Sequence, residues 1–156
     1  MRRRLSILVI ALVLTNVLFY GQSELLGPLT PDDIIGTHPD WQDVITGYVP
    51  SEQAVQKLKD ISFPVQVEVF LGTWCSDSKA QVSAFFKVLD AIDSPLITAS
   101  YVGVPRDKAA RQPYIEGRDI QRIPTFIVSV DGQEVGRIIE TPVKSVEQDL
   151  LDILIR

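Results

Sequence analysis

The hydrophobic residues after Pro50 switch between two spacings along the chain. Apolar side chains three or four positions apart indicate a helix with one buried face, whereas strict alternation indicates a strand. Turn-forming proline, glycine and aspartate residues separate these segments. The predicted elements are a helix from 51 to 61, a strand from 65 to 71, a helix with its apolar stripe from 82 to 92, a strand from 97 to 104, a short irregular helix within 105–122, and strands at 125–130 and 134–139.

Two local patterns define the C-terminal part of the series. Asp131-Gly132, between the last two predicted strands, is typical of a tight β-hairpin turn. Thr141-Pro142 has the residue types of a helix N-cap and first turn, so a last helix is predicted to begin there. The buried face predicted for this helix consists of Val143, Val146, Leu150 and Ile153.

The order of these elements predicts an α/β domain over residues 50–156, with a central mixed sheet and helices on both faces. The strands on either side of the long helix should pair in parallel, because a β-α-β crossover joins them. The segment Trp41–Val49 is a candidate for an additional first strand of the same sheet.

Residues 1–21 are predicted to be a signal peptide or a membrane anchor. Arg2–Arg4 precede the apolar run Leu5–Tyr20, which is the charge-then-apolar order of a secretory signal. The run is shorter than the ~17–25 residues that usually span a bilayer, which favours a cleaved signal. Gly21 suits a cleavage site but the bulky Phe19 does not, so an uncleaved anchor stays open. We therefore expect an exported protein, periplasmic or otherwise extracytoplasmic, soluble or tethered to the membrane through residues 5–20.

Residues 22–49 contain three prolines and no sustained hydrophobic period. This pattern predicts a tether or N-terminal extension of irregular structure. His38 lies within it beside a proline, which is typical of a surface loop, so no catalytic or ligand role is predicted for its imidazole.

Charge and cysteine content exclude several functions. The chain has 15 basic and 20 acidic residues, and three of the basic ones belong to the N-terminal leader, so no nucleic-acid partner is expected. A single cysteine excludes an intrachain disulfide and a multi-cysteine zinc site, and neither a metal nor a cofactor is predicted. A lone cysteine in an exported chain either pairs with a cysteine of another chain, is a reactive thiol, or is inert and buried.

The neighbours of Cys75 favour a reactive thiol. Its segment, 72–78, lies between a predicted strand and a predicted helix, which places Cys75 at the first turn of that helix. Unpaired backbone N–H groups and the positive end of the helix dipole favour a thiolate at this position. Asp77 opposes this effect and Lys79 assists it.

Three segments resemble the thioredoxin family. Trp74-Cys75-Ser76-Asp77-Ser78 is similar to its Trp-Cys-x-x-Cys site, with serine in place of the second cysteine. Arg122-Ile123-Pro124-Thr125-Phe126 resembles the cis-proline loop, and Val130-Asp131-Gly132-Gln133-Glu134 resembles the hairpin between the last two strands. The resemblance covers residues 51–156 and implies a thioredoxin-like fold.

The resemblance also implies roles for individual residues. Cys75 and Ser78 take the catalytic positions, while Trp74, Ile123 and Pro124 take positions that bind an extended substrate chain. In the family, the cis-proline faces the reactive sulfur, and the backbone before it pairs with the substrate.

Two departures from the family pattern bear on the chemistry. Ser78 removes the resolving thiol, so no internal disulfide can form. Val69 stands where the family commonly has a buried acid, and Glu68 should point to the opposite face of the sheet. For Ser78 two readings stay open: its hydroxyl tunes Cys75, or it caps the helix in a capping box with Gln81.

These observations predict a monothiol thiol-disulfide oxidoreductase that forms mixed disulfides with cysteine-containing protein substrates and is released by an external thiol reductant. The alternative is a non-catalytic binding or chaperone module on the same fold. A cysteine-based sensor or a peroxide scavenger is a further alternative. A basic stretch consists of Arg106, Lys108, Arg111, Arg118 and Arg122. It is predicted to be a solvated face, and the alternative is that it approaches Cys75 through the Pro124 loop.

Overall fold

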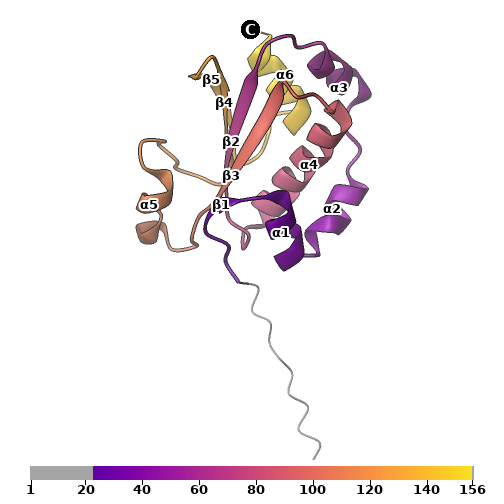
Figure 1. Ribbon diagram of the computed structural model, residues 1–156. Helices are drawn as coiled ribbons and strands as arrows, with labels where there is room; N and C mark the ends of the chain where they lie inside the picture. Colours follow the sequence, from indigo (N-terminus) through magenta and orange to yellow (C-terminus); the bar gives the residue numbers. More distant parts are fainter. Residues whose placement is uncertain (1–22, 156) are drawn as a thin grey trace, which may run out of the picture.

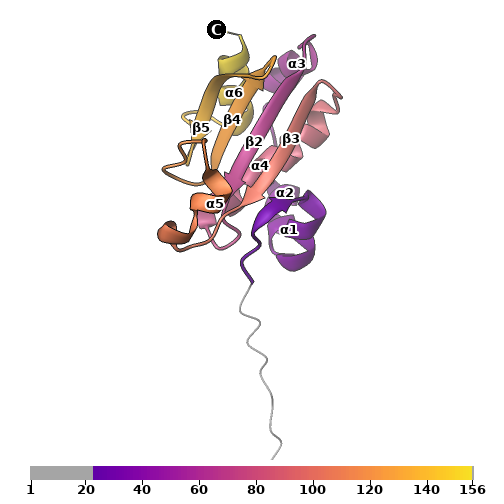
Figure 2. The ribbon, with the colours of Figure 1, turned by 60° about the vertical axis from the view of Figure 1, so that its left-hand side comes forward.

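Five strands form one mixed sheet in the order β1-β3-β2-β4-β5 in the computed structural model, which describes residues 23–155. β2 and β3 pair in parallel, as the β-α-β crossover predicts, and the other neighbours pair antiparallel. Figure 2 shows the strands side by side. Their bounds are β1 Gly27–Leu29, β2 Val65–Leu71, β3 Ile97–Gly103, β4 Thr125–Val130 and β5 Gln133–Ile139.

Helices cover both faces of this sheet, which confirms the predicted fold class. Five helices share a large core on one face, whereas the short α5 lies on the other (Figure 1). The bounds are α1 Pro31–Thr37, α2 Trp41–Gly47, α3 Glu52–Lys59, α4 Ser76–Ile92, the 3-10 turn η1 Lys108–Ala110, α5 Gln112–Ile115 and α6 Val146–Leu154. No helix within residues 23–155 is long and apolar enough to cross a membrane. The predicted leader or anchor, residues 1–21, lies outside the described residues.

Residues 23–49, which were predicted to be an irregular tether or extension, are folded and packed on the rest of the domain. Within it, β1 pairs with β3, and α1 begins with a capping box in which Thr30 and Asp33 each bind the other's backbone N–H. Ile34 and Trp41 are buried in the main core. The prediction of a strand at Trp41–Val49 is therefore wrong, because this segment forms α2. Both helices have seven residues, too few turns for a helical period to show in the sequence.

His38 is buried, which corrects its predicted position in a surface loop. Its Nε2 atom lies 3.1 Å from the carbonyl oxygen of Ser23, and its ring packs beside that of Trp41. The imidazole thus joins the turn between α1 and α2 to the start of the described chain.

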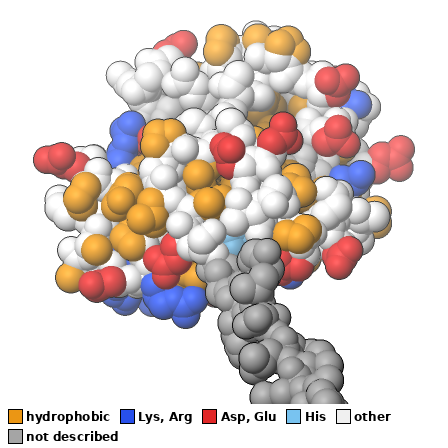
Figure 3. All heavy atoms as spheres, turned by 60° about the horizontal axis from the view of Figure 1, so that its bottom comes forward, with side chains coloured by type: hydrophobic (Ala, Val, Ile, Leu, Met, Phe, Trp, Pro, Cys, Tyr) orange, Lys and Arg blue, Asp and Glu red, His pale blue; other side chains and the backbone are white. Residues whose placement is uncertain are grey.

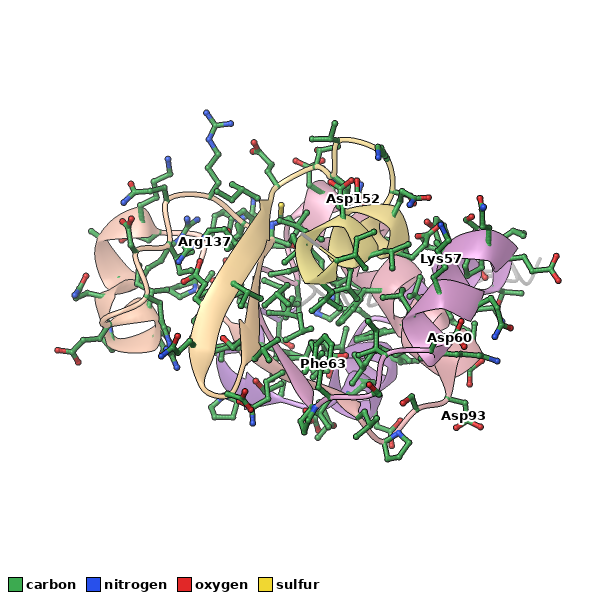
Figure 4. The ribbon with its side chains drawn as sticks, turned by 90° about the horizontal axis from the view of Figure 1, so that it is seen from above. Lys57, Asp60, Phe63, Asp93, Arg137 and Asp152 are labelled. Atoms are coloured by element: carbon green, nitrogen blue, oxygen red, sulfur yellow. The ribbon has the colours of Figure 1, made fainter. Side chains whose placement is uncertain are left out.

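The core fills the layer between the sheet and the helices, as the view from above shows (Figure 4). Phe85 of α4 meets Phe126 of β4 edge to face at its centre, with ring centroids 5.3 Å apart. On the edge strand β5, Arg137 donates hydrogen bonds to the carbonyls of Arg118 and Asp119. These bonds tie the loop after α5 to the sheet.

The last helix begins later than its sequence predicts. The N-cap of α6 is Ser145, whose hydroxyl accepts from the N–H of Gln148, and not Thr141. The Asp149 carboxylate accepts from the backbone N–H groups at 143 and 144, which holds that segment in a loop outside the helix. Val143 is consequently 93% exposed, although it was predicted to be buried.

Glu147 in the first turn of α6 is a buried carboxylate that joins three parts of the fold. It accepts from the hydroxyl of Tyr48 at 2.7 Å, after α2, and from the N–H of Ser51 at 2.9 Å, before α3. Burial opposes ionisation, but these hydrogen bonds outweigh it and lower the pKa of Glu147. Burial and the Glu147 carboxylate raise the pKa of Tyr48.

We expect Glu147→Gln to lower the free energy of unfolding at pH 7 by about 1–3 kcal/mol, because the amide cannot replace both charge-assisted hydrogen bonds. A carboxylate with a lowered folded-state pKa stabilises the protein above its ordinary value of 4.5, and this contribution is lost as pH falls through the folded-state pKa. Urea unfolding at several pH values should therefore show the variant and the native protein converging in acid.

The exposed Glu116 offers a matched control. Glu116→Gln should leave the free energy of unfolding nearly unchanged across the same pH range. A constant difference between Glu147→Gln and the native protein from pH 7 to acid would contradict a role for the ionised carboxylate.

Candidate functional site

Cys75 stands at the junction of the central strand β2 and the long helix α4. It is the N-cap of α4, with extended backbone angles, and its N–H donates to the Gly72 carbonyl at 2.9 Å. The side chain is half-buried. The sulfur thus lies at the end of α4 where backbone N–H groups have no partner within the helix.

The predicted cis-proline loop lies beside this sulfur. The Ile123–Pro124 peptide bond is cis, and the Ile123 carbonyl oxygen is 3.9 Å from Sγ of Cys75. The pairing of β2 with β4, which sets Phe70 opposite Thr125, brings the loop to this end of the sheet. Both loop residues are buried, and because their side chains are apolar, the only polar groups of Ile123 and Pro124 are those of the backbone.

Trp74 packs between the strand end and the segment after β3. Its indole Nε1 donates to the Val104 carbonyl at 3.1 Å. The guanidinium carbons of Arg106 and Arg111 lie 5.0 Å and 5.4 Å from the indole ring centroid, within the range of cation–π attraction.

The basic stretch is only partly the solvated face that was predicted. Arg111 is 6% exposed, and it donates to the carbonyls of Pro105 at 2.9 Å and Arg106 at 3.1 Å. The aromatic ring and these carbonyls replace water around its guanidinium, which accounts for the error. The side chains of Lys108, Arg118 and Arg122 are exposed as predicted.

Ser78 is fully buried inside the first turn of α4. Its hydroxyl accepts from the N–H of Gly72 at 3.1 Å. The capping-box reading is wrong, because Cys75 and not Ser78 is the N-cap of the helix. Ser78 therefore fixes the strand-to-helix turn on which Cys75 stands.

Val69 and Glu68 of β2 face opposite sides of the sheet, as strand alternation predicts. Val69 is buried in the main core, on the helical side of the sheet. Glu68 faces the other side, where its carboxylate pairs with Arg118 at 2.8 Å. Neither residue brings a carboxylate to Ser78.

An open cavity of about 480 Å³ lies next to Cys75. Lys79 crosses its wall to Asp40 at 2.5 Å, and this hydrogen bond lowers the pKa of Asp40. Within residues 23–155, no group of three or more His, Cys, Asp or Glu side chains could hold a metal ion. The cavity is lined by Asp40, Trp41, Thr73, Trp74, Cys75, Ser76, Lys79 and Arg106.

Asp40 and Trp41 were not predicted from the sequence as part of a site, because they belong to the segment expected to be a tether. Arg106 lines the cavity although its side chain is exposed, and an approach of its basic stretch to Cys75 was the alternative prediction. Asp40 and Lys79 are 39 positions apart, and no sequence pattern connects them.

Comparison with known families agrees with this geometry. A family model described as Thioredoxin matches residues 37–151, which is more than half of the chain. The chain belongs to the thioredoxin family. The match begins at Thr37, the last residue of α1, so the family's domain includes α2 and the cavity-lining residues Asp40 and Trp41.

Two solved structures have the same fold as this thioredoxin-family chain. A protein of unknown function from Pseudomonas aeruginosa is 16% identical, with a TM-score of 0.54, and the match covers 79% of this chain and 82% of that one. An HIV epitope scaffold is also 16% identical, with a TM-score of 0.56 and coverage of 79% and 83%. No curated protein matches the chain. Likeness at this identity shows the fold and not the activity.

We expect Gly72→Ala to disturb the site and to lower the free energy of unfolding by about 1–3 kcal/mol through overpacking. A Cβ at this position would lie 2.6 Å from the Trp74 ring and 2.8 Å from Cδ1 of Ile123. The indole N–H resonance of Trp74 should shift, because the ring cannot keep its hydrogen bond to Val104. Chemical unfolding and NMR spectra measure both effects.

Gly36 in α1 provides the control, because a Cβ there meets nothing within 4 Å. Gly36→Ala should be neutral or raise the free energy of unfolding by roughly 0.5–1 kcal/mol, as expected for alanine in a helix. An unchanged Trp74 resonance in Gly72→Ala would show that the Trp74 ring keeps its position without the close approach to the backbone of residue 72.

Proposed function

We propose that this protein is a monothiol thiol-disulfide exchange protein whose nucleophile is Cys75. The observation that carries the proposal is the position of Cys75, half-buried at the N-terminus of α4, beside the Ile123 carbonyl and open to a cavity. A half-buried sulfur that borders an open cavity is accessible to a substrate disulfide.

The exchange proceeds in two balanced steps. The Cys75 thiolate attacks one sulfur of a substrate disulfide; the substrate S–S bond breaks, and the other sulfur leaves as a thiolate that takes a proton from water. The product is a mixed disulfide on Cys75. A second thiol then attacks that bond, releases the Cys75 thiolate and forms a new disulfide with the substrate.

The second thiol has to come from outside the chain. Position 78 carries a hydroxyl that already accepts from the N–H of Gly72, and the chain has one cysteine. Cysteine-containing protein substrates and an external thiol reductant are therefore the proposed partners. Reduction, isomerisation and the removal of thiol adducts are all compatible with this chemistry.

A non-catalytic binding module is the second candidate. The buried Val69 favours it, since the resemblance to thioredoxins assigns an acid to this position, and the chain also lacks the second cysteine. In that case Cys75 would be dispensable while the surface around Pro124 holds a partner chain.

The proposal includes a location outside the cytoplasm. Its support is the order of charged and apolar residues in 1–21, with membrane tethering through residues 5–20 if the leader is not cleaved. An enzyme reporter that is active only outside the cytoplasm, fused after Arg156, should be active in the native host. Activity confined to the cytoplasm would contradict export.

For the exchange activity, we expect Cys75→Ala to abolish mixed disulfides with client proteins and to leave the fold intact, because no disulfide is lost. Ser78→Cys should raise turnover with an external dithiol, because a second thiol one turn along α4 can release the mixed disulfide internally. Mass spectrometry of trapped adducts and a disulfide-reduction assay measure these outcomes. Ser78→Ala serves as the control, since it removes the hydroxyl without adding a thiol.

A native Cys75 that forms no adduct with any disulfide, together with a Cys75→Ala variant that keeps its client proteins bound, would favour the binding module.

A further inference from the structure

The wall of the cavity beside Cys75 carries more positive than negative charge. Lys79 and Arg106 line it, and their partners are the carboxylates of Asp40, at 2.5 Å, and Glu24, at 3.6 Å. The Glu24 pair is exposed and long, so it holds the guanidinium only weakly. Arg106 can therefore donate hydrogen bonds from its guanidinium to a second carboxylate.

Arg111 adds a charge that the described residues do not neutralise. Its buried guanidinium binds two backbone carbonyls and the Trp74 ring, and no carboxylate in residues 23–155 lies within 4.0 Å of it. An arginine guanidinium carries a positive charge at neutral pH. A permanent positive charge is thus fixed behind the tryptophan that precedes Cys75.

This local charge contrasts with the net charge of the molecule. The chain is acidic overall, with a formal net charge of −5, and the face seen in Figure 3, at the end where β2 stops and α4 begins, carries both acidic and basic side chains. At 0.15 M salt, charges more than about 8 Å away are largely screened. A group that enters the cavity therefore responds mainly to Arg106, Lys79 and Asp40 in its wall, to Glu24 beside Arg106, and to Arg111 against the Trp74 ring.

We propose that Cys75 exchanges preferentially with disulfides that carry a carboxylate close to the sulfur, because Arg106 and Lys79 bind this carboxylate and Arg111 attracts it. The proposal rests on the exchange activity proposed above and names its substrate class. Carboxylate-bearing small disulfides and acidic segments of polypeptides share this chemistry. When the Cys75 thiolate attacks one sulfur of the substrate, the substrate S–S bond breaks and the other sulfur leaves as a thiolate. Formation of the mixed disulfide therefore needs no further reactant.

The test compares three small disulfides of similar size that differ in charge. They are 3,3′-dithiodipropionic acid, a dianion; 2-hydroxyethyl disulfide, which is neutral; and cystamine, a dication. Because the full chain has one cysteine, every adduct seen by mass spectrometry is on Cys75. The same rates measured on the chain unfolded in urea correct for the intrinsic reactivity of each disulfide.

Compared with the unfolded chain, the folded protein should form the adduct with the dianion about tenfold faster relative to the neutral disulfide. The rate with the dication relative to the neutral disulfide should be lower in the folded protein than in the unfolded chain. Arg106→Gln should reduce the dianion preference to roughly threefold, and a rise from 0.05 to 0.5 M salt should weaken it. Arg118→Gln makes the same change in net charge, but Arg118 lies outside the cavity and pairs with Glu68, so the preference should persist.

A second pair of probes separates the two sources of the carboxylate. Disulfide-linked dimers of Gly-Glu-Cys-Glu-Gly and Gly-Gln-Cys-Gln-Gly differ only in charge. A preference for the acidic peptide as large as that for the small dianion supports polypeptide clients, whereas a preference confined to the small dianion supports a small disulfide.

Equal rate ratios in the folded and unfolded chain, or equal effects of Arg106→Gln and Arg118→Gln, would overturn the carboxylate preference and leave the exchange activity standing. Failure of all three small disulfides to form an adduct would instead overturn the exchange activity, and the carboxylate preference with it.

Discussion

The backbone of Gly72 is the point on which the site depends. Its N–H is held by the buried Ser78 hydroxyl, and its carbonyl accepts from the N–H of Cys75. The absence of a Cβ lets Trp74 and Ile123 approach the chain there. One residue thereby sets the turn from β2 into α4, the position of the sulfur, and the distance of the proline loop. In this turn Ser78 acts as an acceptor for the backbone, a role that needs no thiol.

The rigidity of this turn comes from the central strand that precedes it. β2 has a neighbour on each side, and its side chains belong to two hydrophobic clusters. Val69 and Leu71 pack under the helices, while Phe70 packs on the other face with Ile123 and Ile127. Closely packed interiors of this kind resist small displacements. Cys75 is therefore placed by the packing on both faces of the sheet and not by a flexible loop.

The sequence was sufficient wherever the determining interactions are local. The hairpin was predictable because Asp131 and Gly132 adopt the positive φ angles that its turn requires, 51° and 76°. The helical period of α4 and the alternation of β2 were equally readable. The seven-residue helices α1 and α2 were not, although the capping box at Thr30 and Asp33 was a usable signal. The start of α6 was predicted at Thr141, whereas the N-cap is Ser145, because the Asp149 carboxylate binds the backbone N–H groups at 143 and 144 and holds them outside the helix.

The part of the site that could not be predicted is its wall, because residues distant in the chain form it. The first described residues contact the segments around Cys75: the N–H of Leu25 donates to the Thr73 hydroxyl at 3.2 Å, and Glu24 binds the backbone N–H of Arg106 at 3.2 Å. Asp40, the N-cap residue of α2, binds Lys79. The region expected to be a passive tether therefore carries the two carboxylates that offset part of the positive charge at the cavity. Arg111, which has the aromatic ring of Trp74 beside it in place of a carboxylate, keeps its charge, so the N-terminal region and the loop after β3 together determine the electrostatic character of the surface next to Cys75.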